Sequence, residues 1–236
     1  MRGFSGLPPE FMDASPAAQV QADFDRIALL STDEWGENSH YHDFLLKHLP
    51  SPCVEALDVG CGTGAFSRLL AQRCKRVLAL DLSPQMIRVA QEHSKPYMNI
   101  DFRVADATTW QFPAERFDCI ASIATLHHLP FRETLANMKH SLKAGGVLLV
   151  LDLFQGEGPL DWLASAMALP VDVVLRLVRR GRLREPAETR AAWDEHGRHD
   201  SYLTLSEIRK TSADILLGAS VTRHLLWRYS LIWKKE

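Results

Sequence analysis

Short apolar runs alternate with amphipathic segments along the chain between residues 54 and 154. Such runs are typical of buried strands, and they predict five, at 54–59, 76–82, 100–107, 117–123 and 145–154. The segments between them have helical spacing, and Ser83-Pro84 supplies one helix with a capping serine and a proline at its first position. Apolar strands that alternate with helices indicate a parallel sheet covered on both faces, so the predicted fold class is doubly wound α/β.

The first fifty residues lack this alternation. Residues 1–22 are rich in Pro, Ala and Gly, which favours a loose leader, and residues 24–49 show an interrupted helical pattern. A Pro-Ser-Pro sequence at 50–52 then precedes the first predicted strand. We therefore divide the chain into an N-terminal leader with a helical cap, 1–50, and one main domain, 51–236.

The alternation also ends after the fifth strand. The helix predicted at 132–143 is expected to end at Gly145-Gly146, with glycine as its C-cap. Residues from about 155 to 215 have a helical pattern split by prolines and are expected to form a lid insertion. The last residues, 219–236, alternate strongly enough to predict two strands joined by a tight turn near Leu226-Trp227. The whole is then a mostly parallel seven-stranded sheet with a C-terminal antiparallel hairpin.

Composition narrows the function classes without selecting one. The chain has 236 residues, 46% apolar and 24% charged, and a net charge of −2, which suits a folded protein and disfavours a generally basic nucleic-acid-binding surface. The apolar stretches fall short of the ~20 residues of a membrane helix, so no membrane span is expected. Irregular spacing disfavours a disulfide framework or zinc site for the four cysteines, Cys53, Cys61, Cys74 and Cys119. A reducing cytoplasm fits this pattern best.

The most informative sequence is the glycine-rich turn that follows the first strand. It reads Asp58-Val-Gly60-Cys-Gly62-Thr-Gly64 and leads into a helix, which lets a ligand approach the backbone closely. Asp81 ends the second strand, where a carboxylate can accept hydrogen bonds from ribose hydroxyls. Asp106 ends the third, where an acceptor can take an adenine amino group. The carboxyl ends of parallel strands form the ligand-binding edge of such sheets, so these groups are expected to lie close together.

Two other interpretations of the turn remain open at this point. A glycine-rich strand–helix turn can serve tight packing alone. Gly60-x-Gly62-x-x-Ala65 also satisfies the pattern of nicotinamide and flavin sites. Two features weigh against a dinucleotide: Gly64 continues the alternating glycines, and the Asp58 carboxylate would repel a pyrophosphate while favouring an amino group.

Residues 54–154 resemble a class I S-adenosylmethionine-dependent methyltransferase of the small-molecule, type-11-like branch. The resemblance rests on the glycine turn, Asp81-Leu-Ser-Pro-x-Met86, Asp106-Ala107, the Ile123-x-x-x-His-His128-Leu segment and the two glycines before strand five. The predicted final hairpin matches that family's closing strands, which nicotinamide folds lack.

The resemblance implies S-adenosylmethionine as cofactor and S-adenosylhomocysteine as product. Asp81 would hold the ribose, Asp106 would bind the adenine edge, and His128 would lie near the methionine portion. The residues expected to contact the cofactor are Asp58, Gly60, Cys61, Gly62, Asp81, Leu82, Met86, Asp106, Ala107, Ile123 and His128.

The family shares no universal catalytic residue, and a base is needed only when the acceptor carries a proton that must leave. The candidate bases are His40 and His127. His42 is expected to face solvent beside a helix N-terminus capped by Asn38 or Ser39. No metal site is expected, because the His40-x-His42 pattern has no further ligand at helical spacing.

The predicted function is transfer of a methyl group to a small organic acceptor by in-line displacement. A catalytically silent S-adenosylmethionine-binding scaffold and an RNA methyltransferase are the alternatives, and the near-neutral charge disfavours RNA. Segment 122–128 lacks the Asn/Asp-Pro-Pro-Tyr/Phe motif of members that methylate nucleobases or glutamine.

An acceptor pocket could be lined by lid residues, Trp162, Met167, Trp193 and Tyr202, although the same spacing suits core packing. The chain is expected to be a monomer or homodimer.

Overall fold

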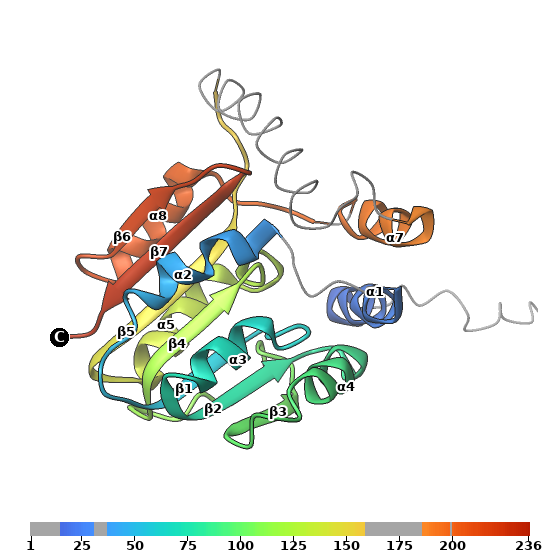
Figure 1. Ribbon diagram of the computed structural model, residues 1–236. Helices are drawn as coiled ribbons and strands as arrows, with labels where there is room; N and C mark the ends of the chain where they lie inside the picture. The colour runs from blue at the N-terminus through green and yellow to red at the C-terminus, as the bar shows by residue number, and fades with distance from the viewer. Residues whose placement is uncertain (1–14, 31–36, 159–185, 199) are drawn as a thin grey trace, which may run out of the picture.

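The computed structural model describes residues 15–30, 37–158, 186–198 and 200–236 (Figure 1). Predictions about residues 1–14 of the leader and about Trp162 and Met167 of the lid lie outside these residues. Seven strands form one sheet in the order β3-β2-β1-β4-β5-β7-β6. The strands are β1 Cys53–Val59, β2 Cys74–Asp81, β3 Ile100–Val104, β4 Phe117–Ile123, β5 Leu142–Leu153, β6 Ser220–Arg223 and β7 Arg228–Lys234.

Helices lie on both faces of this sheet (Figure 1). They are α1 Pro16–Leu30, α2 His42–Leu46, α3 Ala65–Ala71, α4 Pro84–His93, α5 Phe131–Ser141, α7 Ala187–His196 and α8 Leu205–Ile215, with short 3-10 helices η1 Glu37–Tyr41 and η2 Leu126–His128. In β1, Leu57 packs in the core layer shared with α5 and α8, whereas Ala56 packs in the layer shared with α2 and α3. Because adjacent residues of each inner strand serve opposite layers, both must be apolar, and the doubly wound prediction is confirmed.

The predicted closing hairpin is also confirmed. β7 runs antiparallel between β5 and β6, while β1 to β5 pair in parallel. The turn between β6 and β7 contains Leu226 and Trp227, both with positive φ, and the His224 amide donates to the Arg228 carbonyl across it. Three residues, 225–227, therefore separate the closing pair, and residues with positive φ are common in such short hairpin loops.

Three predicted boundaries are wrong. The strand predicted at 100–107 ends at Val104, so Asp106 follows β3 and does not end it. Helix α1 begins at Pro16, so the leader does not extend to residue 22. Helix α5 ends at Ser141 without a glycine cap, and β5 begins at Leu142, before Gly145-Gly146. The pairing of β4 with β5 shifts register between Phe117 and Cys119, so the glycines lie in an irregular start of the strand. Gly145 has φ +76°, which an irregular strand can require as well as a helix end.

A disulfide joins Cys53 and Cys74, contrary to the expectation drawn from cysteine spacing. The two residues are direct partners at the start of the parallel strands β1 and β2. Strand register, which the spacing of cysteines along a sequence does not encode, brings them together. The remaining cysteines, Cys61 and Cys119, are buried free thiols.

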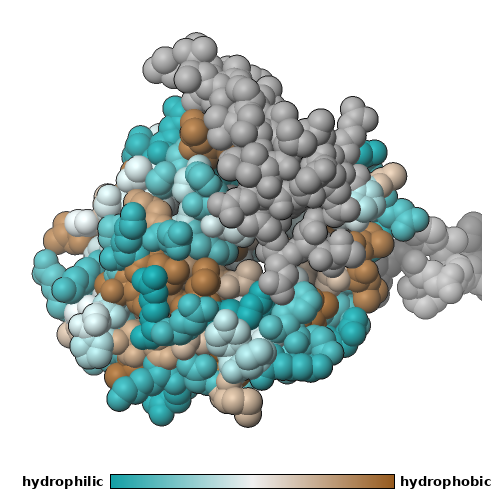
Figure 2. All heavy atoms as spheres, in the orientation of Figure 1, coloured by the Kyte–Doolittle hydropathy of each residue, from teal (hydrophilic) through white to brown (hydrophobic). Residues whose placement is uncertain are grey.

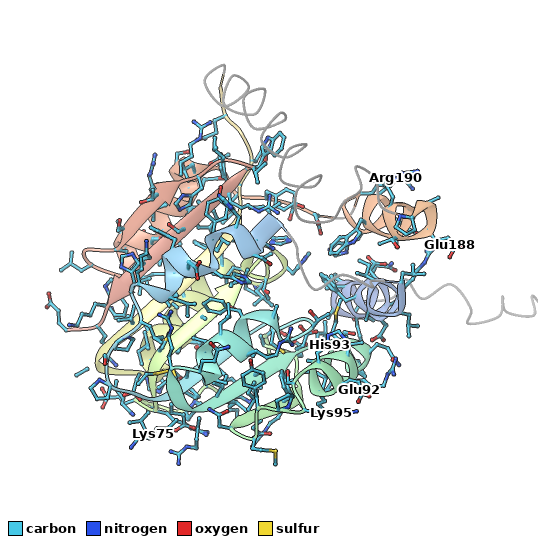
Figure 3. All side chains as sticks on the ribbon, viewed as in Figure 1. Lys75, Glu92, His93, Lys95, Glu188 and Arg190 are labelled. Atoms are coloured by element: carbon cyan, nitrogen blue, oxygen red, sulfur yellow. A yellow bond between two sulfur atoms is a disulfide. The ribbon has the colours of Figure 1, made fainter. Side chains whose placement is uncertain are left out.

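Helices α1 and α7 lie side by side beyond the carboxyl edge of the sheet, with α1 between α7 and α4 (Figure 1). Helix α7 buries Thr189, Ala192 and His196, whereas Glu188 and Arg190 point to solvent (Figure 3). Asp25 of α1 accepts hydrogen bonds from the Ser83 hydroxyl at 2.5 Å and the Gln85 amide at 3.1 Å, at the start of α4. The N-terminal helix is thereby fixed beside the end of β2.

The surface coloured in Figure 2 is mainly polar, with apolar side chains gathered near α2. No helix in the described part of the chain combines the length and the apolar character that crossing a membrane requires.

Candidate functional site

The glycine turn leaves β1 with three residues in the left-handed region, Gly60 at φ +74°, Gly62 at +53° and Gly64 at +77°. A side chain at Gly60 would collide with Thr125, and one at Gly64 would lie 3.0 Å from Phe102. A side chain at Gly62 would have no atom within 4 Å. The turn therefore packs closely at its two ends and leaves open space at Gly62, where a ligand can reach the backbone.

Asp81 at the end of β2 is tied to this turn. One carboxylate oxygen accepts from the Gly62 amide at 2.8 Å, and the other accepts from the Ser83 amide at 2.9 Å. Burial raises the pKa of Asp81, and the hydrogen bonds from Ser83 and Gly62 oppose that rise. A carboxylate has about four acceptor positions, so Asp81 keeps acceptor capacity for hydroxyl groups of a ligand. The structure thus holds Asp81 in a fixed orientation beside the open face of Gly62.

Asp58 and Cys61 lie deeper than their neighbours. The Asp58 side chain is buried and accepts a 2.6 Å hydrogen bond from the Ser67 hydroxyl of α3. Burial raises the pKa of Asp58 to about 7, with the nearby Asp81 adding to the rise and the Ser67 hydrogen bond opposing it. Cys61 is buried, and its amide donates to the Leu80 carbonyl.

The other residues expected at the cofactor are spread along the same edge. Asp106 is half-buried, and one of its oxygens accepts from the amide and hydroxyl of Thr108 at 2.8 and 2.7 Å. Met86 is 5% exposed and packs in a cluster with α1 and α7 residues, so α1 covers it. Three further candidates are partly buried: Leu82, Ala107 and Ile123.

His127 forms a buried pair with Asp152, which lies near the end of the neighbouring strand β5. The ring Nδ1 is 2.6 Å from Asp152 Oδ1, and the His127 amide donates to Oδ2 at 2.9 Å. The side chains are 6% and 1% exposed. Because the carboxylate holds Nδ1, it fixes the ring orientation and leaves Nε2 for other interactions.

His128 lies beside this pair among aromatic and acidic side chains. Its ring centre is 3.9 Å from that of His127 and 5.6 Å from that of Phe24 on α1. Nδ1 lies 3.5 Å from Asp200 Oδ1, and Nε2 is buried without a hydrogen-bond partner among the described residues. Burial lowers the pKa of His128 to about 4, and the charge of His127 acts in the same direction while Asp200 opposes it. The ring is therefore neutral at pH 7.

The two N-terminal histidines differ from the expectation. His40 is exposed and stacks edge-on against Tyr41. His42 is buried against Phe66, so the prediction that it faces solvent is wrong, and burial lowers its pKa to about 4. Nor is α2 capped by a side chain, since Asn38 Oδ1 instead accepts from Arg228 Nε. The preceding η1 turn, rather than a cap, leads the chain into α2 and buries the ring.

Sequence reasoning missed several polar residues of this region. Asp152 is an acid at the carboxyl end of a strand, like Asp81, so the same rule would have found it. Asp200 and His196 come from the insertion, and His196 Nε2 lies 3.6 Å from Asp200 Oδ1. Asp23 of α1 lies 3.2 Å from His196 Nδ1. No local pattern marks these residues, because distant segments bring them together.

One family model and two curated proteins bear on the identity of this chain. Residues 56–146 match a family model described as a methyltransferase domain. The chain is 31% identical over 197 residues to the ubiquinone biosynthesis O-methyltransferase of Xylella fastidiosa, covering 75% of this chain and 77% of that protein. It is 30% identical over 209 residues to an uncharacterised methyltransferase of Mycobacterium bovis, covering 85% of this chain and 96% of the relative.

A solved structure shares the fold. The N-methyltransferase NodS of Bradyrhizobium japonicum, solved in complex with S-adenosylhomocysteine, aligns with a TM-score of 0.57 and 19% identity over 92% of this chain and 98% of its own. At this identity the likeness shows the fold alone.

Proposed function

This chain belongs to the class I S-adenosylmethionine-dependent methyltransferases, and we propose that it transfers the methyl group of S-adenosylmethionine to a small organic acceptor by in-line displacement. The proposal is carried by one observation, the fixed Asp81 carboxylate beside the open face of Gly62. A relative named as an O-methyltransferase of ubiquinone biosynthesis supports a small acceptor and makes phenols and catechols the first compounds to assay.

The residues of the edge fit this cofactor. Gly62 offers backbone that a ligand can approach, Asp81 offers acceptor positions suited to ribose hydroxyls, and Asp106 would bind the adenine. S-adenosylmethionine supplies a methyl carbon already activated by its sulfonium and leaves as S-adenosylhomocysteine. The protein's part is then to align the acceptor and exclude water. Helices α1 and α7 are proposed to contribute to that exclusion.

On the acceptor side we assign His127 and not His40. His127 lies in η2, just after β4, its Nδ1 is held by Asp152, and its Nε2 is left to act on the acceptor side. His40 is exposed, and its ring packs edge-on against Tyr41, away from the carboxyl-edge residues named above.

Calorimetric titration with S-adenosylhomocysteine tests the cofactor assignment. Asp81→Asn removes the charge but keeps the size of the side chain, and a hydrogen bond to a charged group is worth about 1.5–3 kcal/mol, so we expect affinity to fall at least tenfold. Asp101→Asn is the matched control, because Asp101 is 55% exposed, lies on β3 and pairs with Arg103. Unchanged binding by Asp81→Asn would refute the assignment.

The same preparations separate the alternatives. Turnover of a phenol or catechol with S-adenosylmethionine supports the proposed enzyme, whereas binding without turnover of any acceptor supports a silent scaffold. Tight, salt-sensitive RNA binding would support an RNA methyltransferase. The cytoplasmic location and the monomeric or dimeric state stay predictions.

A further inference from the structure

Three side chains converge at the carboxyl edge of the sheet from two distant parts of the chain. His127 and His128 belong to η2, and Asp200 lies between α7 and α8. One possible ligand atom from each lies within 4.8 Å of the other two.

The state of His128 is unusual for a buried imidazole. Its side chain is only 9% exposed, and its Nε2 has no hydrogen-bond partner among the described residues. Its Nδ1 faces Asp200 Oδ1 at 3.5 Å but forms no hydrogen bond in the described structure. Buried polar atoms are nearly always partnered, so the protein contacts of this imidazole leave its polar atoms unsatisfied, and Nδ1 is the atom that faces the carboxylate.

The spacing of this pair suits a shared metal ion. Bonds of about 2.1 Å at a tetrahedral centre place two ligand atoms about 3.4 Å apart. The 3.5 Å between His128 Nδ1 and Asp200 Oδ1 is close to that value. A direct hydrogen bond between a charged carboxylate and an imidazole would be shorter, as the 2.6 Å pair of His127 and Asp152 illustrates.

Outer partners orient two of the three side chains. Asp152 holds His127 Nδ1, which leaves Nε2 as the ligand atom. The Tyr202 hydroxyl donates to Asp200 Oδ2 at 2.7 Å, which leaves Oδ1 for the ion. A carboxylate behind a ligating histidine and a hydrogen bond to a ligating carboxylate are the usual supports of protein metal sites.

We propose that His127, His128 and Asp200 bind one divalent transition-metal ion. Two imidazoles and a carboxylate suit Zn²⁺ and its first-row neighbours, whereas Mg²⁺ and Ca²⁺ prefer oxygen ligands alone. Three protein ligands leave at least one coordination position open, which is typical of catalytic sites.

The role of the ion, though not its binding, rests on the proposed function. A hydroxyl acceptor bound at the open position would lose its proton to solvent as its oxygen coordinates the ion, because a divalent cation lowers the pKa of a bound hydroxyl. In this arrangement His127 activates the acceptor as a ligand and does not itself take the proton.

Titration of the chelator-treated full chain with Zn²⁺ tests the proposal. We expect one ion per chain, with affinity lowered at least tenfold in Asp200→Asn and in His128→Ala. Tyr202→Phe keeps the ring and removes only the hydroxyl, so we expect an affinity about tenfold lower. His140→Ala, at an exposed histidine of α5, is the matched control and should bind Zn²⁺ as the wild type does.

Circular dichroism on the same samples shows that each variant is folded, and titration of the wild type with S-adenosylhomocysteine shows that its cofactor site is intact. Absence of Zn²⁺ binding in a chain that binds S-adenosylhomocysteine would overturn the metal site and leave the proposed function standing. Zn²⁺ binding that is equal in wild type, Asp200→Asn and Tyr202→Phe would overturn it as well, since the ion would then lie elsewhere.

Discussion

The glycine turn makes a quantitative prediction, because its first two glycines differ in what surrounds them. Both have positive φ, which costs a residue with a side chain about 1–2 kcal/mol. At Gly60 an added Cβ would also collide with Oγ1 and Cγ2 of Thr125 and lie 2.6 Å from its Cβ. Overpacking of this kind costs about 1–3 kcal/mol. Gly60→Ala should therefore lower the free energy of unfolding by about 3 kcal/mol, and Gly62→Ala by about 1 kcal/mol.

Urea denaturation of the two single variants measures this difference. Thr125→Gly removes all three clashing atoms, so a double-mutant cycle with Gly60→Ala should show a coupling of about 2 kcal/mol that restores stability. The same cycle with Gly62→Ala should show almost none, because that Cβ would meet nothing within 4 Å.

The variant with the smaller loss of stability, Gly62→Ala, should show the larger loss of ligand affinity. Gly62→Ala places its methyl group in the open space proposed for the cofactor, so it should lower affinity for S-adenosylhomocysteine at least tenfold while the chain stays folded. The reasoning is refuted if Gly60→Ala is no less stable than Gly62→Ala, or if Gly62→Ala binds as the wild type does.

Two further predictions concern stability away from the turn. Burial lowers the pKa of His42 from 6.5 to about 4, so between these pH values the folded state binds fewer protons than the unfolded state. The free energy of unfolding should therefore fall by up to about 3 kcal/mol as the pH drops from 6.5 to about 4. Urea denaturation of His42→Leu over the same pH range should lack the part of this decrease that His42 causes. The disulfide between Cys53 and Cys74 spans a sequence separation of 21, for which loop closure gives about 3 kcal/mol. Dithiothreitol should therefore lower the urea midpoint of the wild type and leave that of Cys53→Ser unchanged.

The sequence was sufficient where local patterns determine structure. Strand β4 has the predicted bounds, 117–123, and the Ser83 hydroxyl accepts from the Met86 amide as an N-cap should. The start of β5 was mispredicted because Gly145-Gly146 fits a helix end as well as an irregular strand, and only pairing with β4 decides between them. The Cys53–Cys74 disulfide likewise depends on the register of two strands.

In the candidate site, contacts on the cofactor side are local in sequence, whereas contacts on the acceptor side join distant segments. This difference explains why family resemblance predicts the cofactor but not the acceptor. On the cofactor side, Asp58 and Ser67 are 9 residues apart, and Gly62 and Asp81 are 19 apart. These contacts form within one strand–turn–helix–strand unit, so a conserved fold can preserve them together. In contrast, Asp23 and His196 are 173 residues apart.

The histidine–acid cluster on the acceptor side thus joins η2, the end of β5, helix α1 and the insertion. Helix α1 and the insertion lie outside the strand–turn–helix–strand unit of the glycine turn, so their sequences can change while the residues of that unit stay the same. Substrate specificity is expected to reside where such independent segments meet, since function is grafted onto a fold through its variable parts. The acceptor must therefore be identified by experiments on His127, His128 and Asp200, whereas the cofactor follows from the fold and the residues of its first two strands.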